Sequence, residues 1–164
     1  MKGNFDASKL LQTLILLEQT GYSFYLEIAS QMEDSKAKNL FVKLAQDEQK
    51  HEQIYTDLLT NLQKNQSTEV DVEDAEYLEL LISTNFFVTN PEEIEKAKKS
   101  YAKEDALAIA EQLERDTIIF LYELMQLNVD LDVKEIQFAL AEEKRHLKSI
   151  LQREFESAIP LLGL

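Results

Sequence analysis

The sequence contains no cysteine, and among its 164 residues there are only 3 glycines and 2 prolines. Without cysteine the chain cannot form disulfides, iron–sulfur clusters or thiolate zinc sites, so any metal must be held by oxygen and nitrogen ligands. The absence also fits a reducing cytoplasm, which is the localisation that we expect. Because glycine and proline interrupt helices and form turns, their scarcity favours long helices over a sheet protein.

Basic charge is also scarce. The chain has 17 Lys and Arg against 31 Asp and Glu, which gives a net charge of −14. Nucleic-acid binding needs clustered basic side chains, so we expect no nucleic-acid partner. No apolar stretch approaches the roughly 18–20 residues that cross a membrane, and we expect no membrane partner. The length suits a single domain over residues 1–164 with a sizeable core.

Apolar residues recur at helical spacing in four long segments, which we place at residues 8–33, 35–64, 104–127 and 132–155. Asp6 or Ser8 is expected to cap the first helix, and Ser35 the second. Residues 65–103 read as a long crossover with short helices at about 72–83 and 91–100. The prediction is an all-α fold, a four-helix bundle of two antiparallel hairpins joined by that crossover.

Both histidines of the chain occur in the same motif, Glu-x-x-His, and each motif follows a lone glutamate on the preceding long helix. Glu143 comes 95 residues after Glu48, and Glu114 comes 96 residues after Glu18, so the hairpin is repeated. Two Glu and two Glu-x-x-His motifs on four inward-facing helices form the ligand set of a carboxylate-bridged dimetal site. The six candidate ligands are Glu18, Glu48, His51, Glu114, Glu143 and His146.

Each of the four glutamates interrupts an apolar stripe of its helix. A buried carboxylate is costly unless it is compensated, and four facing one another would repel. Two divalent cations would balance the four charges, with two neutral imidazoles completing the coordination. The alternative is that the motifs are solvated, because residues 47–52 and 142–145 are charge runs whose members should mostly face water. The coincidence of both motifs and both upstream glutamates with one repeat favours the metal site.

These motifs resemble those of the ferritin-like superfamily and, within it, the rubrerythrin-like diiron proteins. The resemblance covers residues 8–155 and rests on four segments: Leu17–Tyr25, Leu44–His51, Leu113–Tyr122 and Leu140–His146. It implies a ferritin-like bundle that binds two iron ions, with manganese as an alternative, and no haem or iron–sulfur cluster. It also implies that the ligands are terminal Glu18 and Glu114, bridging Glu48 and Glu143, and the nitrogen ligands His51 and His146.

The chain departs from rubrerythrins in two respects. It has no cysteine for their rubredoxin domain, which implies that electrons come from a separate donor protein. Thr117 stands where the family carries another ligating glutamate, and Glu111 is a candidate substitute. Tyr25 and Tyr122, two turns past the upstream glutamates, either hydrogen-bond a bridging carboxylate or are core aromatics. Tyr55 is expected only to pack.

The resemblance implies an oxidoreductase that reduces peroxide or dioxygen at a diiron site; a dimanganese catalase is a variant of the same class. An iron-handling ferroxidase or storage protein is the second hypothesis. A non-catalytic helical adaptor with a structural metal site is the third. The resemblance also implies a homodimer. Histidine ligands favour iron or manganese over magnesium and calcium, which prefer oxygen-only coordination.

Overall fold

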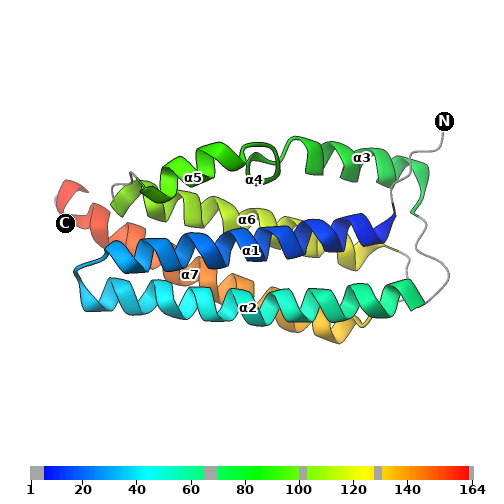
Figure 1. The fold of residues 1–164 in the computed structure, drawn as a ribbon, viewed down its shortest axis with the longest axis horizontal. Coiled ribbons are helices and arrows are strands. Elements are labelled where there is room, and N and C mark those ends of the chain that lie inside the picture. Colours follow the sequence, from blue (N-terminus) through cyan, green and yellow to red (C-terminus); the bar gives the residue numbers. More distant parts are fainter. Residues whose placement is uncertain (1–5, 65–69, 100–102, 128–130, 163–164) are drawn as a thin grey trace.

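The computed structural model describes residues 6–64, 70–99, 103–127 and 131–162, and within these ranges the secondary structure is helical with no strand (Figure 1). Four long helices form the bundle: α1 (Ala7–Gln31), α2 (Ser35–Lys64), α6 (Lys103–Gln126) and α7 (Val133–Leu162). Their bounds lie close to the expected ones except at the end of α7. The all-α, ferritin-like four-helix bundle is therefore confirmed.

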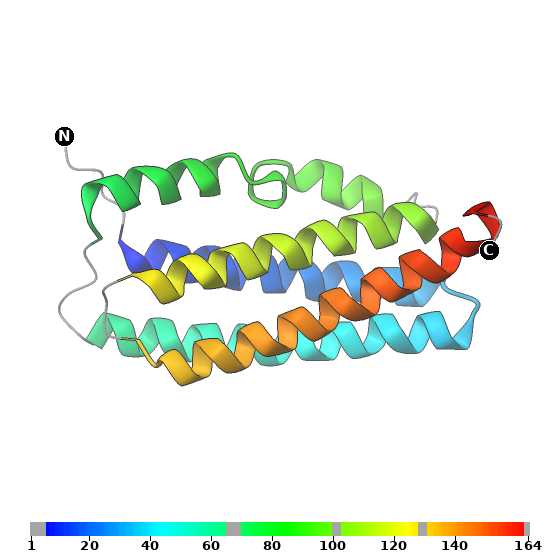
Figure 2. The same ribbon diagram turned by 180° about the vertical axis from the view of Figure 1, so that it is seen from behind.

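Neighbouring long helices run antiparallel, as two hairpins require. α1 packs along α2, α6 packs along α7, and α1 also packs against α6, whereas α2 and α7 touch over a short stretch. The crossover consists of α3 (Val72–Ser83), α4 (Phe86–Thr89) and α5 (Pro91–Lys99). It forms a separate layer along the bundle in both views, where all three of its helices contact α1 and α5 also contacts α6 (Figures 1 and 2).

Aspartates begin three of the long helices. The side chains of Asp6, Asp34 and Asp132 each accept hydrogen bonds from the backbone N–H groups two and three residues further on. These bonds satisfy donors that have no partner within the helix. The expectation that Ser35 caps α2 is therefore wrong, because Asp34 occupies that role and Ser35 is the first helical residue.

The last helix extends further than the sequence pattern indicated. We expected it to end at residue 155, but α7 continues to Leu162. Residues 156–159 contain neither glycine nor proline, so nothing in them opposes helix formation. Proline at position 160 removes one backbone hydrogen bond and is unfavourable inside a helix, but only two helical residues follow it.

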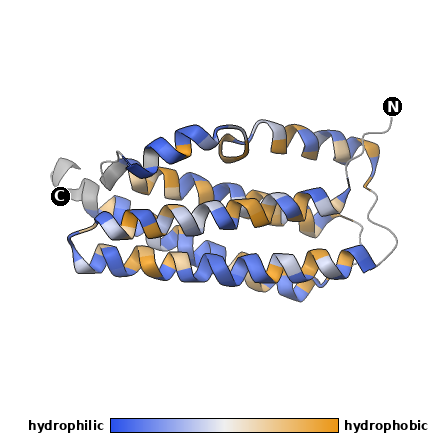
Figure 3. Ribbon diagram, in the orientation of Figure 1, coloured by the Kyte–Doolittle hydropathy of each residue, from blue (hydrophilic) through white to orange (hydrophobic). Residues whose placement is uncertain are grey.

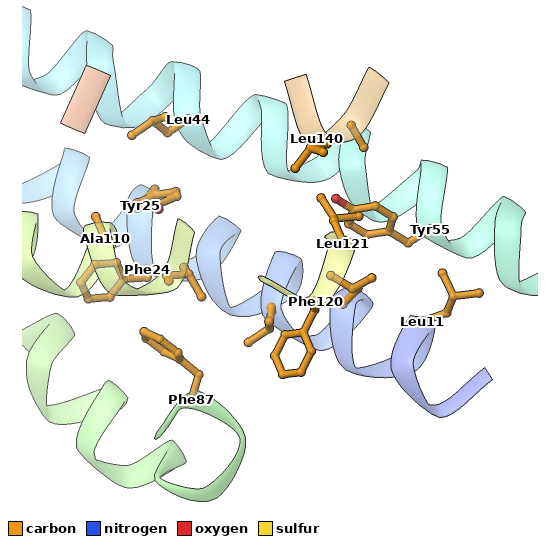
Figure 4. Packing of buried hydrophobic residues seen from close by; sticks show 14 of the residues in the cluster. Leu11, Phe24, Tyr25, Leu44, Tyr55, Phe87, Ala110, Phe120, Leu121 and Leu140 are labelled. Carbon is orange, nitrogen blue, oxygen red and sulfur yellow. The ribbon is translucent and has the colours of Figure 1, made fainter. Parts of the chain in front are cut away.

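Apolar and polar residues alternate along the long helices at helical spacing (Figure 3). The labelled core side chains gather in two groups, one around Tyr25 and Phe24 and one around Tyr55 and Leu121 (Figure 4). Tyr25, Tyr55 and Leu121 are fully buried. Along α1, Glu18 lies between the residues that contribute to these two groups. No helix within the described residues combines the length and apolar character needed to cross a membrane.

Asn85 links the crossover to the bundle, and its replacement tests this link. Its side-chain oxygen accepts from the backbone N–H groups of Phe87 and Val88, and its amide nitrogen donates to Asp116 of α6 over 2.9 Å. Asn85→Ala removes the cap of α4 and the bond to α6, so we expect the free energy of unfolding in urea to fall by about 1–2 kcal/mol. An unchanged value would mean that the hydrogen bonds of Asn85 do not help to hold the crossover on the bundle.

Candidate metal centre

The six candidate ligands are buried in the middle of the bundle. Each helix contributes from the stripe that faces the other three: Glu18 from α1, Glu48 and His51 from α2, Glu114 from α6, and Glu143 and His146 from α7. None is more than 6% exposed, and Glu18, His51 and Glu143 are fully buried. Polar side chains with so little exposure need partners inside the protein.

The side chains converge on a common volume. The residues of the two Glu-x-x-His motifs each offer one ligand atom, and these four atoms lie within 4.8 Å of one another. Nδ1 of each histidine also lies near the upstream glutamate of its own hairpin, 3.8 Å between His51 and Glu18 and 3.7 Å between His146 and Glu114. The centroids of the two imidazole rings are 5.2 Å apart. The structure thus brings together all six residues that the repeat singled out.

Hydrogen bonding within the cluster is incomplete. Eight of its buried oxygen and nitrogen atoms have no hydrogen-bond partner among the described residues, including both oxygens of Glu18 and both nitrogens of His51. His51 Nδ1 is only 2.6 Å from Glu143 Oε1, but not in hydrogen-bonding geometry. Buried polar atoms are rarely left unpaired, and most of these belong to side chains that converge on one volume. Such a donor set fits a pair of divalent cations.

Burial and mutual repulsion oppose the charge of the two upstream glutamates. Burial, together with the charges of Glu143 and Glu48, raises the pKa of Glu18 well above its usual range. Burial and the same two charges raise the pKa of Glu114 in the same direction. In the metal-free protein, both carboxyl groups therefore retain their protons to higher pH than exposed carboxyl groups do.

The histidines and Glu143 carry charge of opposite sign. Burial acts to lower the pKa of His51 and His146, but the close carboxylate of Glu143 at His51, and those of Glu114, Glu143 and Glu48 at His146, outweigh it and raise both pKa values above 6.5. Burial acts to raise the pKa of Glu143, but its close contacts with Glu114, His146 and His51 hold it well below the usual range. Protons on the two imidazoles thus offset carboxylate charge when no cation is bound.

A second layer of acidic side chains lies beside the far nitrogens of the histidines, and one of these contacts, from Asp47 to His146, is a hydrogen bond. Asp47 Oδ2 lies 3.0 Å from His146 Nε2, and Glu142 Oε1 lies 3.6 Å from His51 Nε2. Each acid sits on the hairpin opposite its histidine, so the pairs tie α2 to α7. A carboxylate at the outer nitrogen orients an imidazole toward a metal at the inner one.

We expected most members of the charge runs at residues 47–52 and 142–145 to face water. Asp47 is an exception, since it is 5% exposed. The internal repeat of the sequence contains a pattern that could have predicted the position of Asp47. An acid immediately precedes the bridging glutamate candidate in both copies, Asp47 before Glu48 and Glu142 before Glu143.

Tyrosine hydroxyls reach two of the carboxylates. Tyr25 donates to Glu114 Oε1 over 2.8 Å, and Tyr55 lies 3.5 Å from Glu143 Oε1. Burial, together with the nearby carboxylate charges, raises the pKa of both tyrosines well above 10, so both remain protonated donors. Tyr25 therefore hydrogen-bonds a candidate ligand, as one of the two interpretations of the sequence predicted. The acceptor is the upstream Glu114, however, and not a bridging carboxylate. The expectation that Tyr55 only packs is wrong.

Tyr122 does not reach the site. It is 40% exposed, and the ammonium of Lys144 lies 5.1 Å from its ring centroid. Helical spacing explains the difference, since seven residues turn a helix by about 700°, almost a whole number of turns, and eight turn it about 100° further. Tyr25 and Tyr55 follow the glutamate on their helix by seven residues, but Tyr122 follows Glu114 by eight.

Glu111 is not part of the cluster either. Its carboxylate pairs with Arg115 of the same helix, 2.8 Å from the guanidinium, on a partly exposed surface. A residue three positions before Glu114 points about 60° away from it around the helix. Thr117 is 2% exposed, but its hydroxyl donates to the carbonyl of Leu113 in the preceding turn. Neither Glu111 nor Thr117 therefore supplies the additional carboxylate that the family carries at the position of Thr117.

Gly21 allows the carboxylate of Glu48 to lie against α1. A Cβ at position 21 would meet Glu48 Oε2 at 3.0 Å and Leu113 Cδ2 at 3.1 Å. Both distances are shorter than ordinary van der Waals contact. The absent side chain is thus a requirement of the site rather than of the helix, since glycine inside a helix is otherwise unfavourable.

Comparison with known proteins agrees with this arrangement. The rubrerythrin family model matches residues 9–153. A crystal structure of a proposed ferritin-like diiron-carboxylate protein from Thermotoga maritima superposes with a TM-score of 0.68 at 22% sequence identity. The match covers 96% of this chain and 99% of that one, and at this identity it supports the fold. No curated protein matches the chain.

Gly21→Ala tests the close approach of Glu48. Alanine favours a helix by about 0.5–1 kcal/mol over glycine, which offsets part of the cost of displacing Glu48 and Leu113, so the metal-free variant should remain folded. The displaced carboxylate should nevertheless weaken binding of Co²⁺ by about tenfold, equivalent to about 1.4 kcal/mol. Calorimetric titration measures this, with Thr20→Ala on the exposed side of α1 as the control. Equal affinities in the parent and Gly21→Ala would contradict the proposed role of Gly21.

The pH dependence of stability tests the charge balance. Glu18, Glu114, His51 and His146 all bind protons more tightly in the folded chain, so their contributions are full at low pH and decline as pH rises through the folded pKa values. We expect the metal-free chain in chelator to lose stability toward urea as the pH rises from about 6.5, the ordinary value for histidine, into the alkaline range. Saturating divalent cation should abolish that loss.

Glu154 provides the control. Burial and a hydrogen bond with Glu111 raise its pKa to about 7, so it titrates in the same interval. Glu154→Gln should retain most of the loss if the buried cluster causes it. A metal-free parent that is equally stable at both ends of the interval would show that the cluster does not carry the assigned protons.

Proposed function

The chain belongs to the rubrerythrin family. On that basis we propose that it is a diiron-carboxylate redox protein, which reduces peroxide or dioxygen with electrons from a separate donor protein. The observation that supports this most strongly is the convergence of four carboxylates and two imidazoles, with eight unpaired buried atoms, in the middle of the bundle. These atoms have no hydrogen-bond partner among the described residues, and two cations would provide partners for those that face the centre of the cluster.

In this proposal the helices divide the ligands as the family does. As the resemblance implies, Glu18 and Glu114 would be terminal ligands, Glu48 and Glu143 would be bridging ligands, and His51 and His146 would supply nitrogen. The distances support one histidine beside each upstream glutamate. Asp47 and Glu142 orient the imidazoles from the opposite hairpins.

Nitrogen and carboxylate ligands together select the metal. A mixed set of this kind suits iron or manganese, whereas magnesium and calcium prefer oxygen alone. A pair of ferrous ions would supply two electrons, one from each ion, to a bound peroxide. The sequence has no cysteine for an iron–sulfur or rubredoxin-type centre, so the electrons that restore the ferrous state would come from another protein.

The protein contributes positioning and a dry environment. Burial of the six ligands excludes water, which strengthens every electrostatic interaction around them. Tyr25 and Tyr55 hold protons at two carboxylate oxygens. Glu48 and Glu143 are long side chains, which can change their coordination when an oxygen ligand enters.

Iron binding and ferrous oxidation test the proposal. Anaerobic titration with ferrous salt should saturate at two ions per chain, and added peroxide should oxidise them faster than it oxidises free ferrous iron. Glu114→Gln replaces one ligand by a neutral amide and should bind fewer than two ions. Absorbance of the ferric product follows the reaction, and elemental analysis gives the stoichiometry.

Glu111→Gln is the matched control, because it lies one turn away on the same helix and outside the cluster. It should bind two ions and react as the parent does. The proposal is wrong if the parent binds no iron, or if its oxidation by peroxide is no faster than that of free iron. A native manganese content would instead favour the dimanganese variant.

A further inference from the structure

The internal repeat predicts two equal metal positions, but the structure differs between them. One position lies beside Glu18 and His51 of the first hairpin, and the other lies beside Glu114 and His146 of the second. In each, the histidine nitrogen and the glutamate are separated by almost the same distance, 3.8 and 3.7 Å. The difference lies in what surrounds the two glutamates.

A hydroxyl group contacts only one of them. Tyr25 of α1 reaches across to the second hairpin and donates to Glu114 Oε1 over 2.8 Å. The equivalent residue, 96 positions later, is Leu121, which is fully buried and has no hydroxyl to offer Glu18. Both oxygens of Glu18 consequently lack a hydrogen-bond partner among the described residues, whereas only Oε2 of Glu114 does.

Packing around the Tyr25 side chain keeps its hydroxyl group beside Glu114. Its ring is fully buried and lies 6.0 Å, between centroids, from each of Phe24 and Phe41. Glu114 is 1% exposed, so water does not compete for its Oε1. A hydrogen bond to a carboxylate in such a dry site is among the stronger ones in proteins.

The oxygen that Tyr25 contacts, Oε1 of Glu114, is also the one that lies 3.7 Å from His146 Nδ1. We propose that the hydrogen bond from Tyr25 weakens this oxygen as a metal donor and leaves Oε2 to coordinate, so that the position beside Glu114 and His146 is the one with room for an exogenous anion or oxidant. Glu18 has both oxygens free and can hold the other cation through both. The ion beside Glu114 therefore lacks one protein donor that its counterpart has. This inference rests on the proposed metal pair, and it makes Tyr25 a positioning residue that acts through Glu114.

Two measurements on the full chain test it. A crystal structure with cobalt bound should show Glu114 coordinating through Oε2 alone, with the Tyr25 bond to Oε1 retained, and Glu18 coordinating through both oxygens. Azide binding to the diferric protein, followed by its charge-transfer absorption, should be about tenfold weaker in Tyr25→Phe. The freed Oε1 would then occupy the coordination position that azide takes.

Tyr122→Phe is the control, because it removes a tyrosine hydroxyl of the same bundle that does not reach the site. Its azide affinity should stay within about twofold of the parent. Two bound cobalt ions with Glu114 coordinating through both oxygens, or equal azide affinities in the parent and Tyr25→Phe, would overturn the inference and leave the proposed function intact. A parent that binds no metal would overturn both.

Discussion

The fold depends on how the charge of four glutamates is balanced in a dry interior. Glu18, Glu48, Glu114 and Glu143 are each at most 2% exposed, with two imidazoles as their cationic partners. Isolated charges in such a place would destabilise the bundle by several kcal/mol each. In the metal-free chain, protons on Glu18, Glu114 and both histidines reduce the imbalance. Two divalent cations would remove it entirely.

The six candidate ligands come from one helical hairpin that occurs twice in the chain. One unit, a helix with a lone glutamate followed by a helix with Glu-x-x-His, supplies half of the ligands, and antiparallel packing brings the two halves face to face. The outer acids cross between the halves, Asp47 to His146 and Glu142 to His51. The two halves differ at Tyr25, because the corresponding residue of the second half is Leu121. The two halves share a backbone plan but differ in the chemistry offered to an incoming ligand.

Much of this could be predicted from the sequence, because helical periodicity fixes which residues share a face. The four helices and the convergence of the six candidate ligands follow from it directly. The errors arose where one residue of spacing decides the direction of a side chain. Tyr122, at eight residues from its glutamate, faces outward, whereas Tyr55, at seven, faces the site. The contacts of Asp47 and Glu142 lie between helices, and periodicity within one helix does not reveal these.

The central claim is that cations replace protons in the buried cluster. Its most direct test is the number of protons released when divalent cations bind, measured by titration calorimetry near neutral pH in buffers of different ionisation enthalpy. The account predicts two cations bound per chain with a net release of protons to the buffer. Binding of two cations without proton release would show that the metal-free cluster is not balanced as described here.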